Sequence, residues 1–165
     1  MRFENYHWAA SVIAAHPNHE VYGRTRLQKT VKLLQRLGMP SDYSFQIHFY
    51  GPYSETLQSD IALIEELGLG VEECKPARDG SFYYLLRSEP FQPGPDLGPW
   101  IKPLQLMANA DLIVLELAAT YDAFREQGAS HEEAMKRLRV KKGKKCEEGR
   151  EDYALSLLSG LGLPH

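Results

Sequence analysis

The sequence predicts an α+β fold, mainly because of the order of elements expected between residues 23 and 87. A basic helix, an aromatic-rich strand, an acidic helix and a strand hairpin are expected in turn at residues 26–37, 44–50, 55–67 and 71–86. Apolar residues recur at helical spacing in both helices and alternate with polar residues in the strand. The dipeptide Asp79-Gly80 gives the hairpin a strong turn signal. This order of elements is typical of a winged helix, with the hairpin as its wing.

The first two helices have recognisable ends. A helix is expected at residues 4–15 because apolar side chains recur there at helical spacing, and Pro17 ends it. The basic helix is expected to begin with a capping pair, Thr25 and Gln28, so that its first residue lies near position 26. Gly38 provides a left-handed cap at its other end.

The strand at residues 44–50 is expected to end at a turn formed by Gly-Pro-Tyr, residues 51–53. Ser54 is then placed to cap the acidic helix, which ends at Gly68. The two hairpin strands follow on either side of residues 76–80.

The rest of the chain is predicted to be an irregular arm followed by helices. Residues 88–103 contain five prolines and two glycines, which disfavour regular structure. Helices are expected at residues 109–127, 130–139 and 147–159. The predicted division is a winged-helix-like N-terminal domain, a Pro/Gly-rich connecting arm and a helical C-terminal extension, at residues 1–88, 89–104 and 105–165.

Composition indicates an ordinary globular protein. The chain has 165 residues, of which 43% are hydrophobic and 25% charged, and a net charge of −3. That charge gives no global attraction to nucleic acid or anionic membranes. No apolar run has the ~20 residues of a membrane helix, so a cytoplasmic protein without membrane contact is expected. Cys74 and Cys146 fit no CxxC pattern, and two free thiols are expected.

Two short motifs carry a resemblance to known proteins. Leu-Gln-Lys (27–29) lies in the basic helix, and Tyr-Gly-Pro-Tyr-Ser (50–54) precedes the acidic helix, which ends in Gly-Leu (68–69). In combination they resemble the YwgA-like family of uncharacterised bacterial proteins and, more distantly, the Panacea (SocA-like) antitoxin domains. The first resemblance implies a fold without an assigned activity. The second implies toxin neutralisation or adaptor work, so together they favour a non-enzymatic interaction protein.

Two basic segments are candidates for contact with nucleic acid, because Arg and Lys make most sequence-independent contacts with phosphates. The first is one side of the basic helix (26–36), with the cations Arg26, Lys29, Lys32 and Arg36. The second is the C-terminal basic segment (136–145), whose cations are Lys136, Arg137, Arg139, Lys141, Lys142, Lys144 and Lys145. The alternatives are a solvated or ion-paired face for the first and complementarity to a helix dipole for the second.

The acidic helix favours a different partner. In winged-helix DNA readers the helix before the wing usually enters the major groove. Here it carries no Lys or Arg but four carboxylates, those of Glu55, Asp60, Glu65 and Glu66, which phosphates would repel. The alternative function is therefore an antitoxin-like or adaptor protein whose helix at residues 55–66 binds a basic protein partner.

Other residue types point to neither catalysis nor a cofactor. The aromatic cluster Tyr43, Phe45, Phe49, Tyr50 and Tyr53 is expected to fill the core, with a stacking platform for single strands as the alternative. His16 and His19 lack a third ligand nearby in sequence, so no metal site is expected. No GxSxG, GxxxxGK[ST] or HExxH motif occurs, and the protein is predicted not to be an enzyme.

Overall fold

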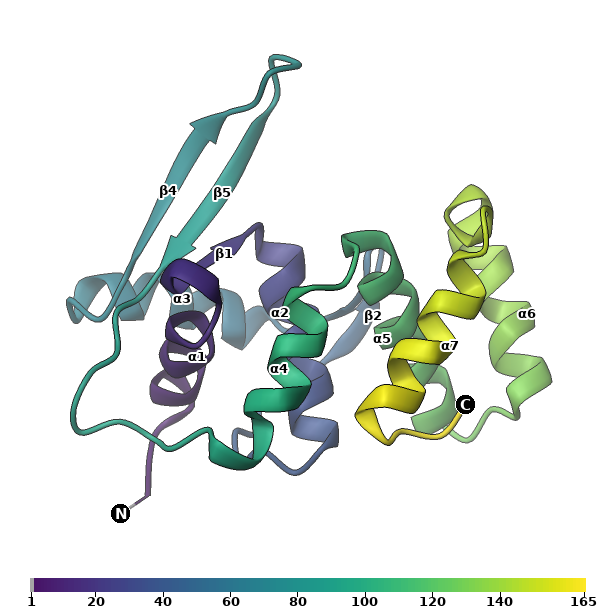
Figure 1. Cartoon of the computed structure of the whole chain (residues 1–165), viewed down its shortest axis with the longest axis horizontal. Coiled ribbons are helices and arrows are strands. Elements are labelled where there is room, and N and C mark those ends of the chain that lie inside the picture. Colours follow the sequence, from purple (N-terminus) through teal and green to yellow (C-terminus); the bar gives the residue numbers. More distant parts are fainter. Residues whose placement is uncertain (1) are drawn as a thin grey trace.

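Helices and short strands alternate along the first half of the chain, and helices dominate the second half (Figure 1). The structure, a computed structural model, describes residues 2–165. The chain begins with α1 (Asn5–Ala14), β1 (Glu20–Tyr22) and α2 (Arg24–Arg36). The predicted α+β class is confirmed.

The start of α2 differs from the prediction. Gly23 precedes the helix with a φ of 97°, a backbone conformation that glycine adopts readily. Thr25 therefore lies inside the first turn, and no side chain caps the helix. The capping pair was wrong because Gln28 binds a distant segment, at Ser54, instead of the start of its own helix.

The aromatic segment forms a small separate hairpin. β2 (Gln46–His48) pairs antiparallel with β3 (Gly51–Tyr53), and Phe49 and Tyr50 connect them. Gly-Pro-Tyr is thus a strand, and the prediction that it forms the turn was wrong. α3 (Glu55–Glu66) follows, and its N-cap is as predicted, since Ser54 Oγ accepts a hydrogen bond from the Leu57 amide.

The predicted hairpin is present. β4 (Val71–Pro76) and β5 (Phe82–Arg87) are antiparallel, and β1 pairs with the other edge of β5, giving the strand order β1-β5-β4. The inward residues Val21 and Leu86 are direct partners and are buried. Figure 1 shows the far end of this hairpin projecting away from the helices.

The connecting arm is irregular only in its first part. A short 3-10 helix (Gly98–Trp100) leads directly into α4 (Ile101–Ala108), which the proline content had hidden. Pro103 is tolerated because it lies in the first turn, where the backbone N–H has no partner within the helix. Trp100 anchors the arm, donating from Nε1 to the Leu37 carbonyl at 3.2 Å.

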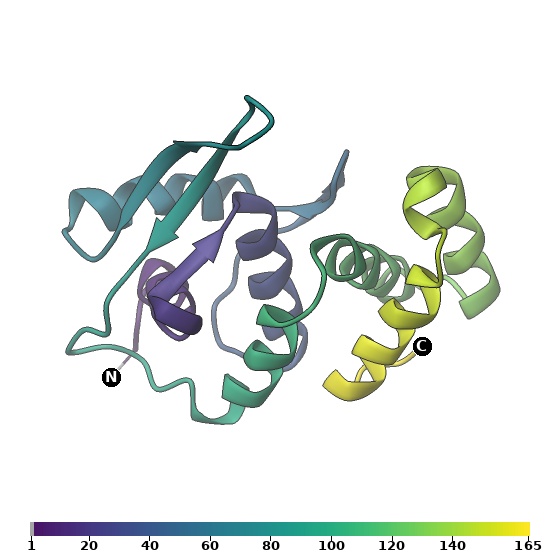
Figure 2. The same cartoon turned by 45° about the horizontal axis from the view of Figure 1, so that its top comes forward.

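Three further helices complete the chain: α5 (Leu112–Glu126), α6 (His131–Lys142) and α7 (Arg150–Leu161). They gather at the end of the molecule away from the β4–β5 hairpin (Figure 2). Ser130 caps α6 at the expected start of this helix, but α6 continues past the expected end and stops at Gly143, whose φ is 53°. The basic residues at 139–142 are therefore helical.

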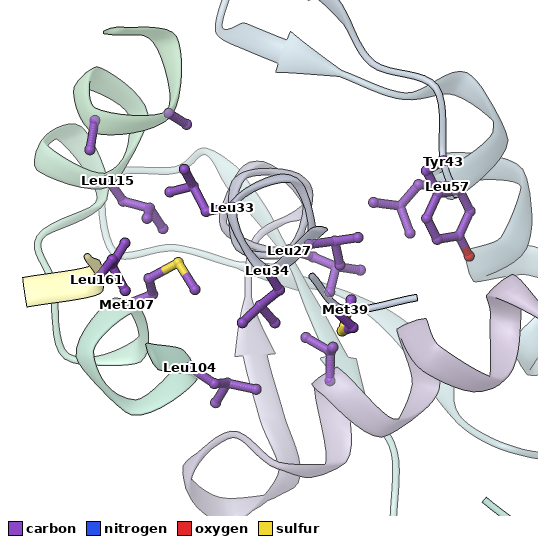
Figure 3. Packing of buried hydrophobic residues seen from close by; sticks show 14 of the residues in the cluster. Leu27, Leu33, Leu34, Met39, Tyr43, Leu57, Leu104, Met107, Leu115 and Leu161 are labelled. Carbon is purple, nitrogen blue, oxygen red and sulfur yellow. The ribbon is translucent and has the colours of Figure 1, made fainter. Parts of the chain in front are cut away.

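α2 lies at the centre of the core. All eight residues from Leu27 to Leu34 are buried. Figure 3 looks along α2, with Leu33 facing Leu115 on one side and Leu27 facing the side of Leu57 and Tyr43 on the other. One cluster of buried hydrophobic residues includes side chains from both halves of the chain. The division into separate domains stays a prediction.

Candidate functional site

The two motifs behind the family resemblance bind each other. The Gln28 side chain donates from Nε2 to the Ser54 carbonyl at 2.9 Å and accepts from the Ser54 amide at Oε1 at 2.8 Å. Lys29 Nζ donates to the Pro52 carbonyl at 2.8 Å. Two consecutive side chains of α2 thereby supply hydrogen-bond partners to the buried backbone at residues 52–54, where the Ser54 carbonyl also accepts from the Gln58 amide.

The β2–β3 hairpin is also held from the C-terminal side. Gly51 has a φ of 97°, and a side chain there would collide with Thr120 Oγ1 of α5. Lys142 Nζ donates to the Phe49 carbonyl at 3.2 Å. The hairpin is thus fixed between α2, α5 and the end of α6.

Two lysines contact one buried carboxylate behind this hairpin, and the charge of the same carboxylate acts on a third lysine, Lys29. Lys145 Nζ and Lys142 Nζ lie 2.9 and 3.4 Å from Glu116 Oε2. Lys29 is 1% exposed, and burial lowers its pKa from 10.5 to about 8, although the charge of Glu116 partly opposes this shift. Three ammonium groups facing one carboxylate leave an excess of positive charge.

The four cations that the sequence places on one side of the basic helix, Arg26, Lys29, Lys32 and Arg36, do not form a free basic face. Each is at least partly buried and has a partner inside the molecule. Besides Lys29, these contacts are Arg26 Nη1 to the Met107 carbonyl (2.8 Å), Arg26 Nη2 to the Ala110 carbonyl (3.0 Å), Lys32 Nζ to Glu126 (2.7 Å) and Arg36 Nε to Asp122 (2.8 Å). The ion-paired alternative was open from the sequence, but these partners could not be named because they lie far along the chain, in and before α5.

The C-terminal basic segment divides into bound and free cations. Arg139 pairs with Glu151 at 2.7 Å, and Lys142 and Lys145 pair with Glu116. The other four are exposed and have no ion-pair partner within residues 2–165: Lys136, Arg137, Lys141 and Lys144. The two basic segments come together near Glu116, where Lys29 of the first lies close to Lys142 and Lys145 of the second. The exposed cations of the C-terminal segment take no part in this cluster.

A groove of about 760 Å³ runs beside α6. Lys136, Arg137 and Lys141 line it together with apolar side chains of Ile47, Phe124 and Val140, and with Gln127 and Glu133. The Arg137 guanidinium lies 4.3 Å from the centre of the Phe124 ring. The groove thus combines three cations and one carboxylate with an apolar floor.

The aromatic cluster is only partly core. Tyr43 is buried, and its hydroxyl donates to Asp60 of α3, which together with burial raises the pKa of Tyr43. Phe49 and Tyr50, at the tip of the β2–β3 hairpin, are 79% and 54% exposed. For these two the core interpretation was wrong.

The remaining carboxylates of α3 face solvent. Glu55, Glu65 and Glu66 are exposed, and within residues 2–165 none of them has an ion-pair partner. This is the acidic surface that a basic protein partner would contact.

The histidines are used structurally. His16 Nδ1 lies 2.7 Å from the Val12 carbonyl, and burial lowers the pKa of His16. In the part of the chain that the structure describes, no three His, Cys, Asp or Glu side chains are grouped to hold a metal ion. Cys74 and Cys146 are free thiols, as predicted. No described helix is long and apolar enough to cross a membrane.

Comparison with known proteins gives one partial similarity. The chain is 37% identical over 65 residues to the uncharacterised protein YwgA of Bacillus subtilis (strain 168), a stretch that covers 39% of each protein. This supports the resemblance to YwgA-like proteins. No protein-family model matches the chain, and no solved structure matches it.

The Gln28–Ser54 contact is the main feature that sequence reasoning missed. A signal was present, because the two motifs were distinctive only in combination, and side chains that bind each other across the fold produce such pairs. The three-lysine cluster gave no such signal. Its other members, Glu116, Lys142 and Lys145, lie 87 or more residues after Lys29 in the chain.

Proposed function

We propose that this chain is a non-enzymatic binding module that contacts nucleic acid through the exposed part of its C-terminal basic segment. The observation that carries the proposal is the group of four exposed cations without ion-pair partners in the described chain: Lys136, Arg137, Lys141 and Lys144. Cations without ion-pair partners can neutralise phosphates without first breaking ion pairs of their own. The groove beside α6 adds a concave surface to them.

Exposed aromatic rings adjoin the same surface and favour single strands. Lys142 contacts the Phe49 carbonyl, and Lys145 Nζ lies 5.1 Å from the centre of the Tyr50 ring. Exposed aromatic rings beside cations bind unpaired bases by stacking, which contributes ~1–3 kcal/mol per base. A base stacked on Phe49 or Tyr50 would bring its phosphates toward the end of α6.

The proposal includes a winged-helix-like architecture for the first half of the chain. The strand order β1-β5-β4 and the position of α3 directly before the hairpin support it. In this protein, however, the helix before the hairpin presents exposed carboxylates, so nucleic acid would use the C-terminal extension instead of α3. The partnered cations of α2 stay outside the contact surface.

The rival is an antitoxin-like or adaptor protein that binds a basic protein through α3. The exposed carboxylates of Glu55, Glu65 and Glu66 favour it. The two functions use separate surfaces, so they predict opposite effects of charge changes. Replacing these acidic residues would weaken the binding of a basic protein partner and leave nucleic-acid binding intact.

A salt titration tests the leading proposal. Fluorescence anisotropy would follow binding of random-sequence single strands and duplexes at several salt concentrations. Engagement of the four free cations gives an expected slope of log K against log salt near −3.6 for duplex, from about 0.9 counterions per phosphate contact. Lys142 and Lys145 are left unchanged, because removing them would strip Glu116 of its partners.

Matched double variants separate this surface from general charge. Lys141→Gln with Lys144→Gln should flatten the slope by about 1.8. Arg78→Gln with Lys102→Gln removes two exposed cations elsewhere and should leave affinity almost unchanged. Absence of binding at low salt, or equal losses in both double variants, would refute the nucleic-acid proposal and favour the protein-partner function.

A further inference from the structure

A second cavity lies at the β2–β3 hairpin and shares no lining residue with the α6 groove. It has a volume of about 320 Å³ and is bounded by the start of α2, the hairpin and α3. This is within the usual size of small-molecule sites, which combine apolar walls with a few converging polar groups. The residues that matter for its chemistry are Arg24, Lys29, His48, Phe49, Tyr53 and Gln58.

The cavity has cationic walls and no carboxylate among its lining residues. Arg24 uses Nε and Nη2 to bind Glu72, which leaves Nη1 free within the described chain. Lys29 uses one of three N–H donors for the Pro52 carbonyl. The lysine cluster around Glu116 adds excess positive charge behind the cavity. An anionic group would therefore be favoured here, and a cation would be repelled.

Gln58 supplies an unused acceptor at the same place. Its Oε1 is inaccessible to solvent and has no hydrogen-bond partner within residues 2–165. An unpaired buried amide oxygen is unfavourable, so a ligand that donates a hydrogen bond to it would remove that cost. The ligand is thus expected to carry a hydroxyl or amino donor as well as its negative charge.

The third property of the cavity is its aromatic wall. The ring centres of His48 and Tyr53 are 5.2 Å apart. Phe49 and Tyr50, which are exposed, extend this wall toward solvent. Flat rings of this kind bind another planar ring by stacking. The hydroxyl groups of Thr25 and Tyr53 are further hydrogen-bond donors beside the cationic ones. Together they are more donors than a carboxylate ligand, with two oxygens, would use, and they suit a phosphate, which has more acceptor oxygens.

We propose that this cavity binds a nucleoside 5′-monophosphate. Its phosphate matches the Arg24 and Lys29 side, its base matches the aromatic wall, and its hydroxyl or amino groups match Gln58 Oε1. This site shares Phe49 and Tyr50 with the proposed strand contact but none of its four free cations, and it binds a single nucleotide, so it goes beyond the proposed contact with nucleic-acid strands.

Isothermal titration calorimetry with the full chain tests the site, using adenosine 5′-monophosphate as the probe. Adenosine and ribose 5-phosphate serve as comparison ligands that lack the phosphate and the base. Binding of the nucleotide is expected to be saturable and at least about tenfold tighter than binding of either fragment. Ribose 5-phosphate that binds as tightly as the nucleotide, or no saturable binding of the nucleotide, would overturn the proposal.

The decisive variant is Gln58→Met, which preserves side-chain length and removes the unpaired acceptor. It should weaken nucleotide binding about tenfold while leaving the thermal midpoint unchanged or higher, because no native hydrogen bond is lost. The control Gln105→Met, on an exposed position of α4, should bind as the unaltered protein does. Equal nucleotide affinity in both variants would overturn the role of Gln58.

The anisotropy titration of strands, run on the same preparations, keeps the two proposals separate. Gln58→Met should leave the salt slope for duplex unchanged, and Lys141→Gln with Lys144→Gln should leave nucleotide binding unchanged. If both variants weakened both ligands to the same extent, a single shared surface would replace the separate cavity.

Discussion

At the scale of single residues, the least ordinary group is the buried ammonium of Lys29. An ammonium that is 1% exposed loses most of its hydration, and one carbonyl and a shared carboxylate replace only part of it. The folded chain therefore binds this proton more weakly than the unfolded chain does. The residue that completes the Leu-Gln-Lys motif thus carries an electrostatic cost as well as a structural contact.

This cost predicts a pH dependence of stability. The pKa of Lys29 is about 8 when folded and near 10.5 when unfolded, so between these values the unfolded chain binds more protons. The free energy of unfolding should therefore rise with pH across that window, by at most about 3 kcal/mol from this group. Tyr43 acts in the opposite direction above pH ~10, because its raised pKa favours unfolding once unfolded tyrosines ionise.

Comparison with Lys29→Met isolates the contribution of this residue. The variant leaves the Pro52 carbonyl without its partner and should be less stable at every pH, but the difference from the unaltered protein should widen from pH 8 to 10. Urea denaturation at pH 7, 8.5 and 10 measures it. For the control Lys102→Met, at an exposed position, the free energy of unfolding should change with pH as it does in the unaltered protein. The same pH dependence in Lys29→Met would contradict the prediction.

At the scale of elements, the joint between α2 and the β3–α3 connection should be among the most sensitive in the fold. Gln28→Ala leaves the buried amide of Ser54 without a partner and removes one of the two hydrogen bonds to the Ser54 carbonyl, which still accepts from the Gln58 amide. The expected loss is about 1–3 kcal/mol, because one buried group is left unsatisfied. Gln105→Ala, on exposed α4, should change the free energy of unfolding by less than about 0.5 kcal/mol. Urea denaturation of both variants decides this, and equal losses would show that the joint is not special.

Elements that depend on local rules were predicted well from the sequence. Ser54 and Ser130 cap their helices, and Asp79-Gly80 lies at the turn of the β4–β5 hairpin, because each acts on residues next to it in the chain. α4 was missed because a proline in the first turn of a helix resembles a proline in a loop.

The candidate surfaces were predicted less well, for a physical reason. Periodicity places cations on a side of a helix but does not say what lies opposite them. Arg36 looked free and is bound to Asp122, whereas Lys136 looked similar and is exposed. Arg36 is paired because α5 packs against α2. Local spacing does not reveal such contacts, because the two residues are far apart in the sequence.

At the scale of the whole molecule, the two halves share one core through α2. Leu27 faces the part of the core that holds Leu57 of α3, and Leu33 faces Leu115 of α5 (Figure 3). It also binds α5 through the Lys32 and Arg36 ion pairs. Loss of the C-terminal helices would expose one side of this central helix, so the halves should not unfold independently.

A cooperativity test follows from this shared core. Trp8 and Trp100, both near the first half, report unfolding by fluorescence, whereas far-ultraviolet circular dichroism reports the helices of both halves. The two urea transitions of the unaltered protein should coincide. Leu115→Ala should lower both midpoints together, with a loss of about 2–5 kcal/mol for a buried leucine, although neither tryptophan lies in α5. Leu112→Ala, where the side chain is 38% exposed, should cost much less. If Leu115→Ala shifted the circular dichroism transition and left the fluorescence midpoint in place, the C-terminal helices would form a separate folding unit, as the division at residues 89–104 predicts.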